Sequence, residues 1–191
     1  VVFNCEPLAD FLDLVFIGDG EELVPEFLDR LKELKHAGAS RREKILALAS
    51  IEGIYAPALY DLEESHGLLV PVGNGSAPFP VKRRILMDLD RFPFPDRIVV
   101  PHGEIVHDRV SIEIMRGCPN GCRFCQAGTT RLPVRTRPIE QIVEAARTAL
   151  AATGYDEISL LSLSTSDYPH LDELIGRLNA ETVKVLGRAD V

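Results

Sequence analysis

One short stretch, residues 116–128, constrains this chain more than any other part of it, and it reads Arg-Gly-Cys-Pro-Asn-Gly-Cys-Arg-Phe-Cys-Gln-Ala-Gly. Three of the four cysteines, Cys118, Cys122 and Cys125, fall within it at the spacing C-x3-C-x2-C. The intervening Pro-Asn-Gly favours turns, so the segment can curl around a metal centre. Core packing does not require this spacing, and the stretch therefore predicts a metal site.

The number of cysteine ligands distinguishes between the possible kinds of metal site. Each of the four irons of an iron–sulfur cubane takes a soft sulfur ligand, so three cysteines would leave one iron open. A ferredoxin-type cluster or a structural zinc site needs a fourth protein ligand, and Cys5 lies more than a hundred residues upstream. An open-site cluster is the favoured interpretation, with zinc, an electron-transfer cluster and free thiols as alternatives.

Composition narrows the class of protein. The 191 residues are 46% hydrophobic, enough for a buried core, and the net charge of −8 argues against non-specific attraction to nucleic acid or anionic lipid. No signal peptide or apolar run of transmembrane length is evident, and a thiolate-bound cluster needs a reducing compartment, so we expect a cytoplasmic protein. The chain starts at Val1 and stops within an apparent strand, so we expect a fragment.

Basic residues gather around the cysteines. Between residues 109 and 137 one acid, Glu113, stands against six arginines: Arg109, Arg116, Arg123, Arg131, Arg135 and Arg137. They would either compensate thiolates and bind the carboxylate of a cofactor or an anionic substrate, or form a solvated basic face. Arg116 and Arg123, which adjoin the cysteines, are the favoured cofactor-binding pair.

The first half of the chain predicts two structural parts. Residues 1–53 are typical of the end of an α/β domain, with a buried strand at 12–17 and a helix starting in a capping box at Asp19 and Glu22. A second helix is expected from the capping box at Ser40 to about Gly53. Residues 54–108 predict a β-rich, proline-containing connector, with short strands at 54–59, 68–72, 81–86 and 97–100.

Residues 109–191 alternate between strand-like and helix-like runs. Strands are expected at 110–115, 158–163 and 182–186, with helices from Pro138 to Gly154 and over 171–178. Such alternation predicts a parallel sheet, with the cysteine segment and the polar run 162–167 at the carboxyl ends of its strands, where ligands bind. The alternative is that Ser164 to Asp167 cap the next helix.

With Phe124 directly before the third cysteine, the C-x3-C-x2-C loop resembles that of the radical S-adenosylmethionine (radical SAM) superfamily. Residues 3–180 more narrowly resemble the middle of uncharacterised bacterial proteins in which a cobalamin-binding-like domain precedes the radical SAM domain. The segments that carry the resemblance are Gly18 to Glu21, Leu89 to Pro95, the cysteine loop and Ser162 to Tyr168.

The resemblance implies an α/β fold in three parts. Residues 1–53 would be the C-terminal part of a Rossmann-like domain, 54–108 the connector, and 109–191 the N-terminal part of a truncated TIM-type radical SAM barrel. It also implies a [4Fe–4S] cluster on Cys118, Cys122 and Cys125, whose open iron chelates S-adenosylmethionine. The implied cofactor contacts are Phe124, Ser162, Leu163, Ser164, Arg116 and Arg123. No cobalamin is claimed, because no ligand for it can be named.

The activity implied by the resemblance is reductive cleavage of S-adenosylmethionine by an enzyme that draws electrons from a reductant such as flavodoxin or ferredoxin. The resulting 5′-deoxyadenosyl radical would abstract hydrogen from a substrate, with methyl or methylthio transfer to RNA or protein as an analogy. The alternative is a non-catalytic zinc or electron-transfer module. No catalytic side chain is assigned, and no membrane or DNA partner is expected. An exposed strand edge at 182–186 predicts self-association.

Overall fold

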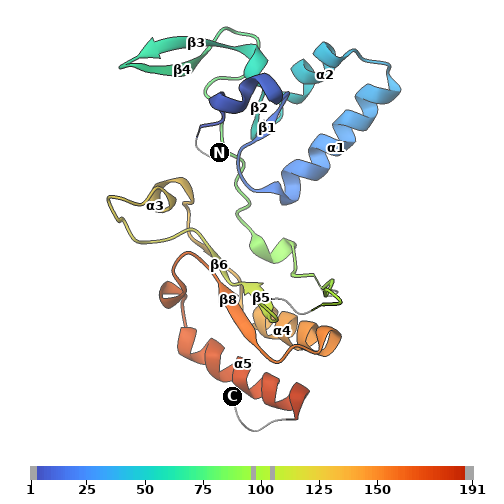
Figure 1. The fold of residues 1–191 in the computed structure, drawn as a ribbon, viewed down its shortest axis with the longest axis vertical. Coiled ribbons are helices and arrows are strands. Elements are labelled where there is room, and N and C mark those ends of the chain that lie inside the picture. Colours follow the sequence, from blue (N-terminus) through green and yellow to red (C-terminus); the bar gives the residue numbers. More distant parts are fainter. Residues whose placement is uncertain (1–3, 96–97, 104–105, 188–191) are drawn as a thin grey trace. The chain divides into compact units, whose positions relative to one another are not determined.

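The computed structural model describes residues 4–95, 98–103 and 106–187, and the chain forms two compact units, Val1–Leu86 and Met87–Val191. Figure 1 shows the order of the elements along the chain. Residues 54–108, predicted as one connector, are divided between the two units. None of the helices in the described part of the chain combines the length and apolarity needed to cross a membrane.

The first unit contains two helices, a β-hairpin and a small two-stranded sheet (Figure 1). Its elements are η1 (Glu6–Phe11), β1 (Val15–Phe16), α1 (Gly20–His36), α2 (Arg41–Leu48), β2 (Ile54–Tyr55), η2 (Pro57–Leu59), β3 (Tyr60–Ser65) and β4 (Leu68–Gly73). Strand β1 pairs with β2, and β3 pairs with β4, both antiparallel. Among the described residues, parallel pairing in this unit is limited to an isolated bridge between Gly18 and Arg84.

Local signals predicted some of these elements well. The capping box of α2 is confirmed, since Ser40 Oγ accepts from the Glu43 N–H at 3.3 Å and Glu43 Oε2 accepts from the Ser40 N–H at 2.7 Å. The capping box predicted at Asp19 and Glu22 is wrong: the Asp19 side chain makes no cap hydrogen bond to α1, and its Oδ2 accepts from the Leu86 N–H at 2.8 Å. Helix α2 ends at Leu48, short of Gly53, and strand 12–17 shrinks to Val15–Phe16.

Gly18 explains both the short strand and the Gly-Asp-Gly turn. Its φ is +126°, and a Cβ there would lie 2.0 Å from the Arg84 carbonyl oxygen. The backbones on either side are joined, because the Arg84 N–H donates to the Ile17 carbonyl and the Asp19 N–H donates to the Arg84 carbonyl. The glycine therefore permits a close backbone crossing, and the expected strand at 81–86 is reduced to this bridge.

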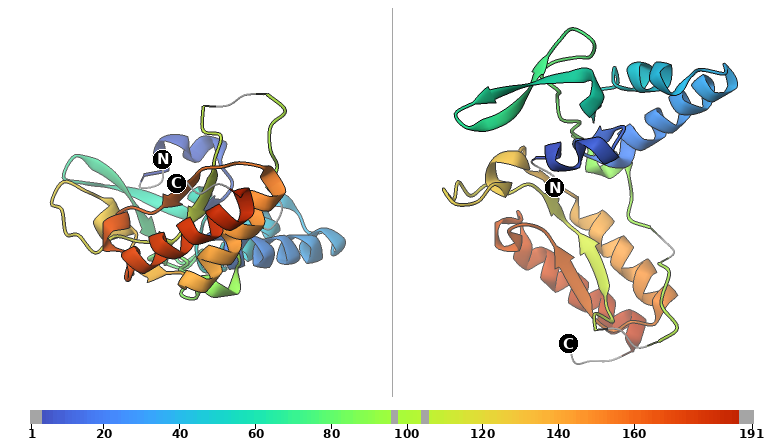
Figure 2. Two further views of the ribbon diagram at one scale, coloured as in Figure 1. Left: turned by 90° about the horizontal axis from the view of Figure 1, so that it is seen from below. Right: turned by 45° about the horizontal axis from the view of Figure 1, so that its top comes forward.

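The second unit is built on two parallel strands. Its elements are η3 (Leu89–Arg91), β5 (Val110–Glu113), β6 (Met115–Arg116), α3 (Ala127–Thr130), β7 (Arg135–Thr136), α4 (Ile139–Thr153), β8 (Ile158–Leu161), η4 (Thr165–Asp167) and α5 (Leu171–Leu186). Strands β5 and β8 pair in parallel, from Val110 opposite Ile158 to Glu113 opposite Leu161. Helices α4 and α5 lie side by side and share one buried core with β5 (Figure 2). The predicted parallel pair with its intervening helix is confirmed.

Three boundaries in this unit differ from the sequence expectations. The strand predicted at 110–115 is divided into two strands, β5 and β6. The strand predicted at 158–163 ends two residues early, at Leu161. Pro138 is the residue before α4, whereas Gly154 ends the helix with φ +75°, as predicted. Of the strand expected at 97–100, residue 97 lies outside the described residues, and residues 98–100 form no strand.

The strand expected at 182–186 is wrong, because α5 continues without a break from Leu171 to Leu186. Val183 and Val185 are β-branched and suggested a strand. The stronger signal is the buried series Leu174, Leu178 and Thr182, whose spacing of four is helical, and the Thr182 hydroxyl donates to the Leu178 carbonyl at 2.9 Å. The exposed strand edge predicted there is therefore absent.

Candidate functional site

The parallel strands bring two loops to one edge of the sheet. The first, residues 117–134, follows β6 and carries the three cysteines; we call it the cysteine loop. The second, residues 162–168, follows β8 and contains η4; we call it the serine loop. Because β5 and β8 run in the same direction, both loops start at carboxyl ends of strands, where α/β proteins bind ligands.

The cysteine loop is closed at its base. Strand β6 pairs antiparallel with β7, with Arg116 opposite Arg135, and the buried Arg135 donates from Nε to the Pro133 carbonyl at 3.1 Å. Gly117 has φ +87°, and a Cβ there would lie 2.8 Å from the carbonyl oxygens of both Arg131 and Pro133. The entering and leaving strands therefore meet at a point where only glycine fits.

The three cysteines lie in a turn at the protein surface. Cys118 and Cys125 are half-buried, Cys122 is exposed, and the Cys125 N–H donates to the Cys122 carbonyl at 3.0 Å. Within the described residues, no three His, Cys, Asp or Glu side chains gather around a single ion. Three thiolates fall one short of the four ligands of a structural zinc site, whereas they would bind three of the four irons of a cubane. This soft three-sulfur donor set on one curled loop fits an iron–sulfur cluster.

Cys5, the remaining candidate for a fourth thiolate, belongs to the first unit. It packs against the core that contains Tyr55 and Tyr60. Burial, and then the negative charge of Glu6, raise the pKa of its thiol, and both effects disfavour the thiolate that a metal needs. Its surroundings are those of a packed residue.

Asn120 brings the two loops together. Its Nδ2 lies 2.6 Å from Asp167 Oδ2, 3.3 Å from Ser164 Oγ and 3.7 Å from Cys118 Sγ. The Pro-Asn-Gly sequence predicts only a turn at Asn120, whereas its link to Asp167 joins residues 47 positions apart. No local pattern could have found it, because the contact depends on the parallel pairing of β5 with β8.

The serine loop forms its own turn and does not cap α5. Ser164 Oγ donates to Asp167 Oδ2 at 2.6 Å, and the hydroxyls of Ser162 and Thr165 lie 2.7 Å apart. The residue before α5 is His170, which makes no side-chain cap, so the capping hypothesis for Ser164 to Asp167 is wrong. Leu163 is 53% exposed beside these hydroxyls.

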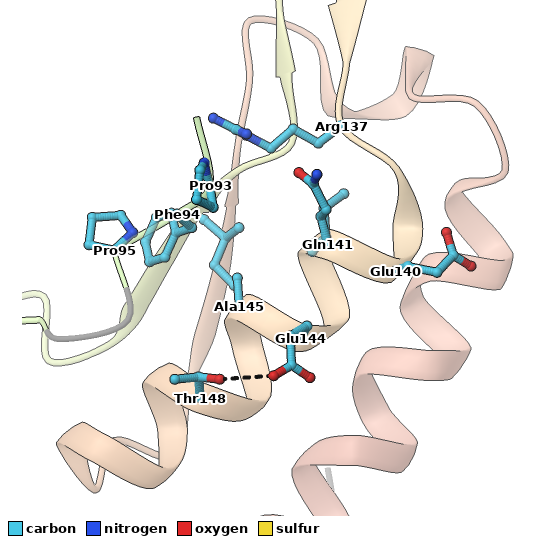
Figure 3. A pocket seen from close by; sticks show the side chains of 11 residues that line it. Pro93, Phe94, Pro95, Arg137, Glu140, Gln141, Glu144, Ala145 and Thr148 are labelled. Atoms are coloured by element: carbon cyan, nitrogen blue, oxygen red, sulfur yellow. Dashed lines mark hydrogen bonds between the residues drawn. The ribbon is translucent and has the colours of Figure 1, made fainter. Parts of the chain in front are cut away.

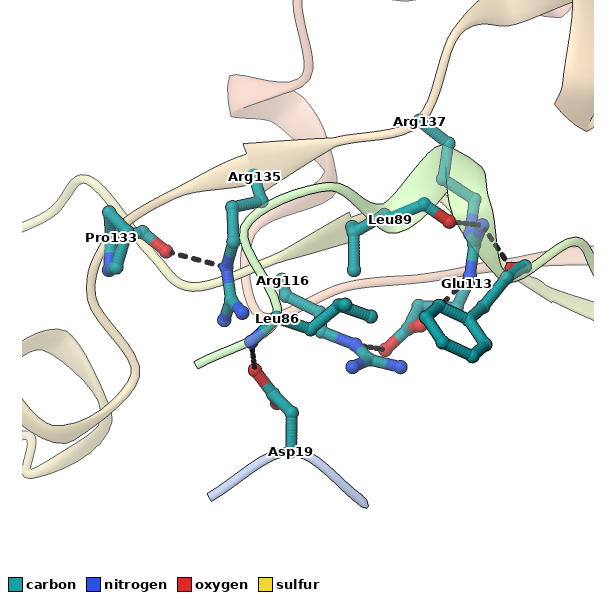
Figure 4. A network of polar contacts seen from close by, with 9 residues as sticks. Asp19, Leu86, Leu89, Glu113, Arg116, Pro133, Arg135 and Arg137 are labelled. Atoms are coloured by element: carbon teal, nitrogen blue, oxygen red, sulfur yellow. Dashed lines mark hydrogen bonds and ion pairs between the residues drawn. The ribbon is translucent and has the colours of Figure 1, made fainter. Parts of the chain in front are cut away.

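The six arginines do not form one surface patch. Arg109 pairs with Glu157 at 2.8 Å, and Arg116 Nε donates to Glu113 Oε1 at 2.9 Å. Arg137 is buried and donates to the carbonyls of Leu89 (Figure 4) and Phe92. Arg123 and Arg131 have exposed side chains in the cysteine loop. Of the predicted cofactor-binding pair, Arg116 therefore has an acidic partner and Arg123 faces solvent.

The aromatic residue of the cysteine loop is open to solvent. Phe124 is 91% exposed, although a phenyl ring of this size ordinarily finds a core or a partner. It stands directly before Cys125 in the turn. An exposed ring beside the proposed cluster ligands is available to an apolar or aromatic part of a bound cofactor.

A pocket of about 670 Å³ lies away from the cysteines, between residues 93–95 and helix α4 (Figure 3). Its lining residues include Ile112, Glu140, Gln141 and Glu144. No sequence motif predicted this pocket. None of the predicted cofactor-binding residues lines it, so it is separate from the candidate site.

Comparisons with known proteins define the class. Residues 112–188 match the family model described as the radical SAM superfamily, and residues 1–57 match the model described as radical SAM proteins, N-terminal. The two matches together cover more than half of the chain. Residues 112–188, which contain the cysteine loop, therefore belong to the radical SAM superfamily, as that loop indicated.

Individual relatives are similar to parts of the chain. The ribosomal protein uS12 methylthiotransferase RimO of Moorella thermoacetica is 28% identical over 168 residues, which are 80% of this chain and 38% of that protein. The tRNA-2-methylthio-N(6)-dimethylallyladenosine synthase of Chlorobium phaeobacteroides is 44% identical over 57 residues, 30% of this chain and 12% of that protein. The chain thus spans less than two fifths of the length of these curated relatives.

A similar solved structure is that of the radical S-adenosylmethionine methyltransferase TsrM of Kitasatospora setae, with tryptophan and a SAM analogue bound. It aligns with 91% of this chain and 30% of its own, at a TM-score of 0.46 and 16% sequence identity.

Proposed function

We propose that this chain is the cluster-binding part of a radical SAM enzyme. The observation that carries the proposal is the cysteine loop, which is closed at its base by β6 and β7 and held beside the serine loop through Asn120. Cys118, Cys122 and Cys125 would hold three irons of a [4Fe–4S] cluster and leave one iron for S-adenosylmethionine.

The remaining site residues would bind and orient the cofactor. The exposed ring of Phe124 offers an apolar surface, and the hydroxyls of Ser162 and Ser164, with Leu163 between them, offer polar and apolar contacts at the carboxyl end of β8. Arg123 and Arg116 supply positive charge next to the thiolates. When bound, the cluster and S-adenosylmethionine would supply a one-electron reductive cleavage that starts radical chemistry.

The reaction we propose is methyl or methylthio transfer. It is supported by relatives whose names describe methylthiotransferases acting on a ribosomal protein and on tRNA. The electron would come from a flavodoxin or ferredoxin. Because a thiolate-bound cluster needs a reducing compartment, we place the protein in the cytoplasm.

The proposed domain organisation follows the family matches. Residues 109–191 would supply the first strands of a radical SAM barrel, supported by the parallel β5–β8 pair. Residues 1–53 would end a Rossmann-like domain, and the separate family match over 1–57 supports a distinct N-terminal domain. Residues 54–108 would connect the two.

Single cysteine substitutions test the proposal. After anaerobic reconstitution with iron and sulfide, Cys118→Ala, Cys122→Ala and Cys125→Ala should each lose the broad visible absorption of the cluster. Cys5→Ala is the matched control and should retain it, because its thiol belongs to a packed core in the other unit. Zinc in place of iron and sulfide in the purified wild-type chain, or cluster loss in Cys5→Ala, would rule out the open-site cluster.

A further inference from the structure

The carboxamide of Asn120, which joins the two loops of the proposed site, has three acceptors. Two of them, Asp167 Oδ2 at 2.6 Å and Ser164 Oγ at 3.3 Å, belong to the serine loop. The third, Cys118 Sγ at 3.7 Å, is a proposed cluster ligand. Since an amide nitrogen carries two hydrogens, Asn120 can donate to the serine loop and to the sulfur at the same time.

Asp167 is held in place by contacts of its own. Its Oδ2 accepts from Ser164 Oγ at 2.6 Å, and its backbone N–H donates to the Ser164 carbonyl at 3.1 Å. The next residue, Tyr168, is buried and donates from its hydroxyl to the Arg137 carbonyl at 2.7 Å. Burial raises the pKa of Tyr168, so its hydroxyl keeps the proton that it donates. The acceptor that faces Asn120 is therefore fixed to the body of the unit.

The backbone of Asn120 is confined from the other side. Gly128, in the short helix α3, lies so close that a Cβ there would be 2.7 Å from the Asn120 carbonyl oxygen. The main chain of Asn120 is thus packed against α3 while its side chain is bound by Asp167. The position of its second N–H, toward Cys118, follows from these two constraints.

We propose that Asn120 is a positioning residue that joins the serine loop to Cys118 and raises the reduction potential of the cluster. The inference rests on the proposed function, because it requires Cys118 to be a ligand. A bound cluster would become more negative on taking one electron from an external one-electron donor, and the Asn120 N–H donated to the Cys118 sulfur would stabilise that added charge. The carboxylate of Asp167 has the opposite effect, because its negative charge disfavours the reduced state.

The test is a potentiometric titration of the reconstituted chain with dithionite, followed by electron paramagnetic resonance. Asn120→Ala should lower the midpoint potential by up to ~59 mV. For one electron, this shift is a tenfold change in the redox equilibrium constant. Asp167→Asn should raise it, because the charge is removed while the Asn120 carboxamide stays. Asn74→Ala is the matched control: Asn74 accepts from the Ser76 N–H in a turn of the first unit, and its loss should leave the potential unchanged.

Hydrogen exchange of the cluster-free chain tests the link between the loops without the metal. Asn120→Ala should speed amide exchange in both the cysteine loop and the serine loop, and Asp167→Ala should do the same. Exchange that rises only in the mutated loop would overturn the coupling.

The outcomes separate this inference from the proposed function. A wild-type chain that takes up no cluster contradicts the proposed function. A wild-type cluster whose potential is the same in Asn120→Ala and Asp167→Asn overturns the role of Asn120 alone. If Asn120→Ala fails to hold the cluster, Asn120→Leu decides, because it keeps the side-chain volume and every thiolate but removes the N–H: a lowered potential supports the inference and an unchanged one refutes it.

Discussion

A single residue, Gly117, controls the closure of the cysteine loop. Gly117→Ala would place a methyl group 2.8 Å from two carbonyl oxygens at φ +87°. The backbone conformation alone costs about 1–3 kcal/mol, and relief of the clash must move β6 away from residues 131–133. We expect a lower unfolding temperature together with loss of iron from the reconstituted chain.

Two other glycines serve as controls for this prediction. Gly121→Ala is in the same loop, and its added Cβ would meet nothing within 4 Å, so stability and iron content should hardly change. Gly154 has φ +75°, and an added Cβ there would meet nothing within 4 Å. Gly154→Ala therefore measures the cost of this backbone conformation alone, about 1 kcal/mol of stability, at a position outside the cysteine loop. If Gly117→Ala kept its iron and were no less stable than Gly154→Ala, the loop would not depend on this closure.

The side chain of Arg137 connects one element, η3, to the rest of the second unit. It is 7% exposed and donates to the Leu89 carbonyl at 2.6 Å and to the Phe92 carbonyl at 2.9 Å. Arg137→Met keeps much of the volume but leaves both acceptors without this donor, and we expect a loss of about 2–4 kcal/mol in the free energy of unfolding. Urea unfolding measures the loss, and hydrogen exchange over residues 89–92 shows where it acts.

Arg177→Met is the matched control for Arg137→Met. Arg177 pairs with Glu140 at 2.8 Å on the exposed surface of α5, where solvent screens the pair and little stability is gained. Its loss should leave exchange at residues 89–92 unchanged. An equal effect of the two substitutions would mean that the buried arginine does not hold η3.

The elements that could be predicted from sequence are those with local signals. The Ser40 capping box, the end of α4 at Gly154 and the strand beginning at Leu68 depend on residues within a few positions of one another. The parallel pairing of β5 with β8 was predictable because strand and helix patterns alternate. These signals placed the cysteine and serine loops at one edge of the sheet.

The features that could not be predicted from the sequence depend on tertiary contacts. The β-branched Val183 and Val185 favoured a strand, but the buried face that includes Leu174 and Leu178 keeps them in α5. Asp19 has the spacing of a capping box, yet its carboxylate binds the N–H of Leu86, 67 positions away. Asn120 likewise finds its acceptors only after the sheet has formed.

At the scale of the whole molecule, the candidate site belongs to a single unit. The three cysteines and the serine loop all lie in Met87–Val191, and the radical SAM family match at 112–188 falls entirely within it. The N-terminal match at 1–57 falls entirely within Val1–Leu86. Cluster binding by the proposed ligands therefore requires contacts made within the second unit.

The small parallel sheet of that unit predicts self-association. Within the described residues, β5 and β8 each have a strand partner on one side only, and a strand edge without a partner can pair with another chain. Leu161, which ends β8, is 48% exposed. We expect the apparent mass in sedimentation velocity to rise with protein concentration.

A lysine at the strand edge should weaken this association. Leu161→Lys places a charge at the end of β8, and a penalty of about 1 kcal/mol would raise the apparent dissociation constant roughly fivefold. Ile175→Lys removes a comparably exposed apolar side chain, 42% exposed on α5, away from any strand edge, and should leave the dissociation constant unchanged. Equal weakening by both variants would assign the association to general surface hydrophobicity, and a monomer at every concentration would show that the strand edges of this sheet do not pair between chains.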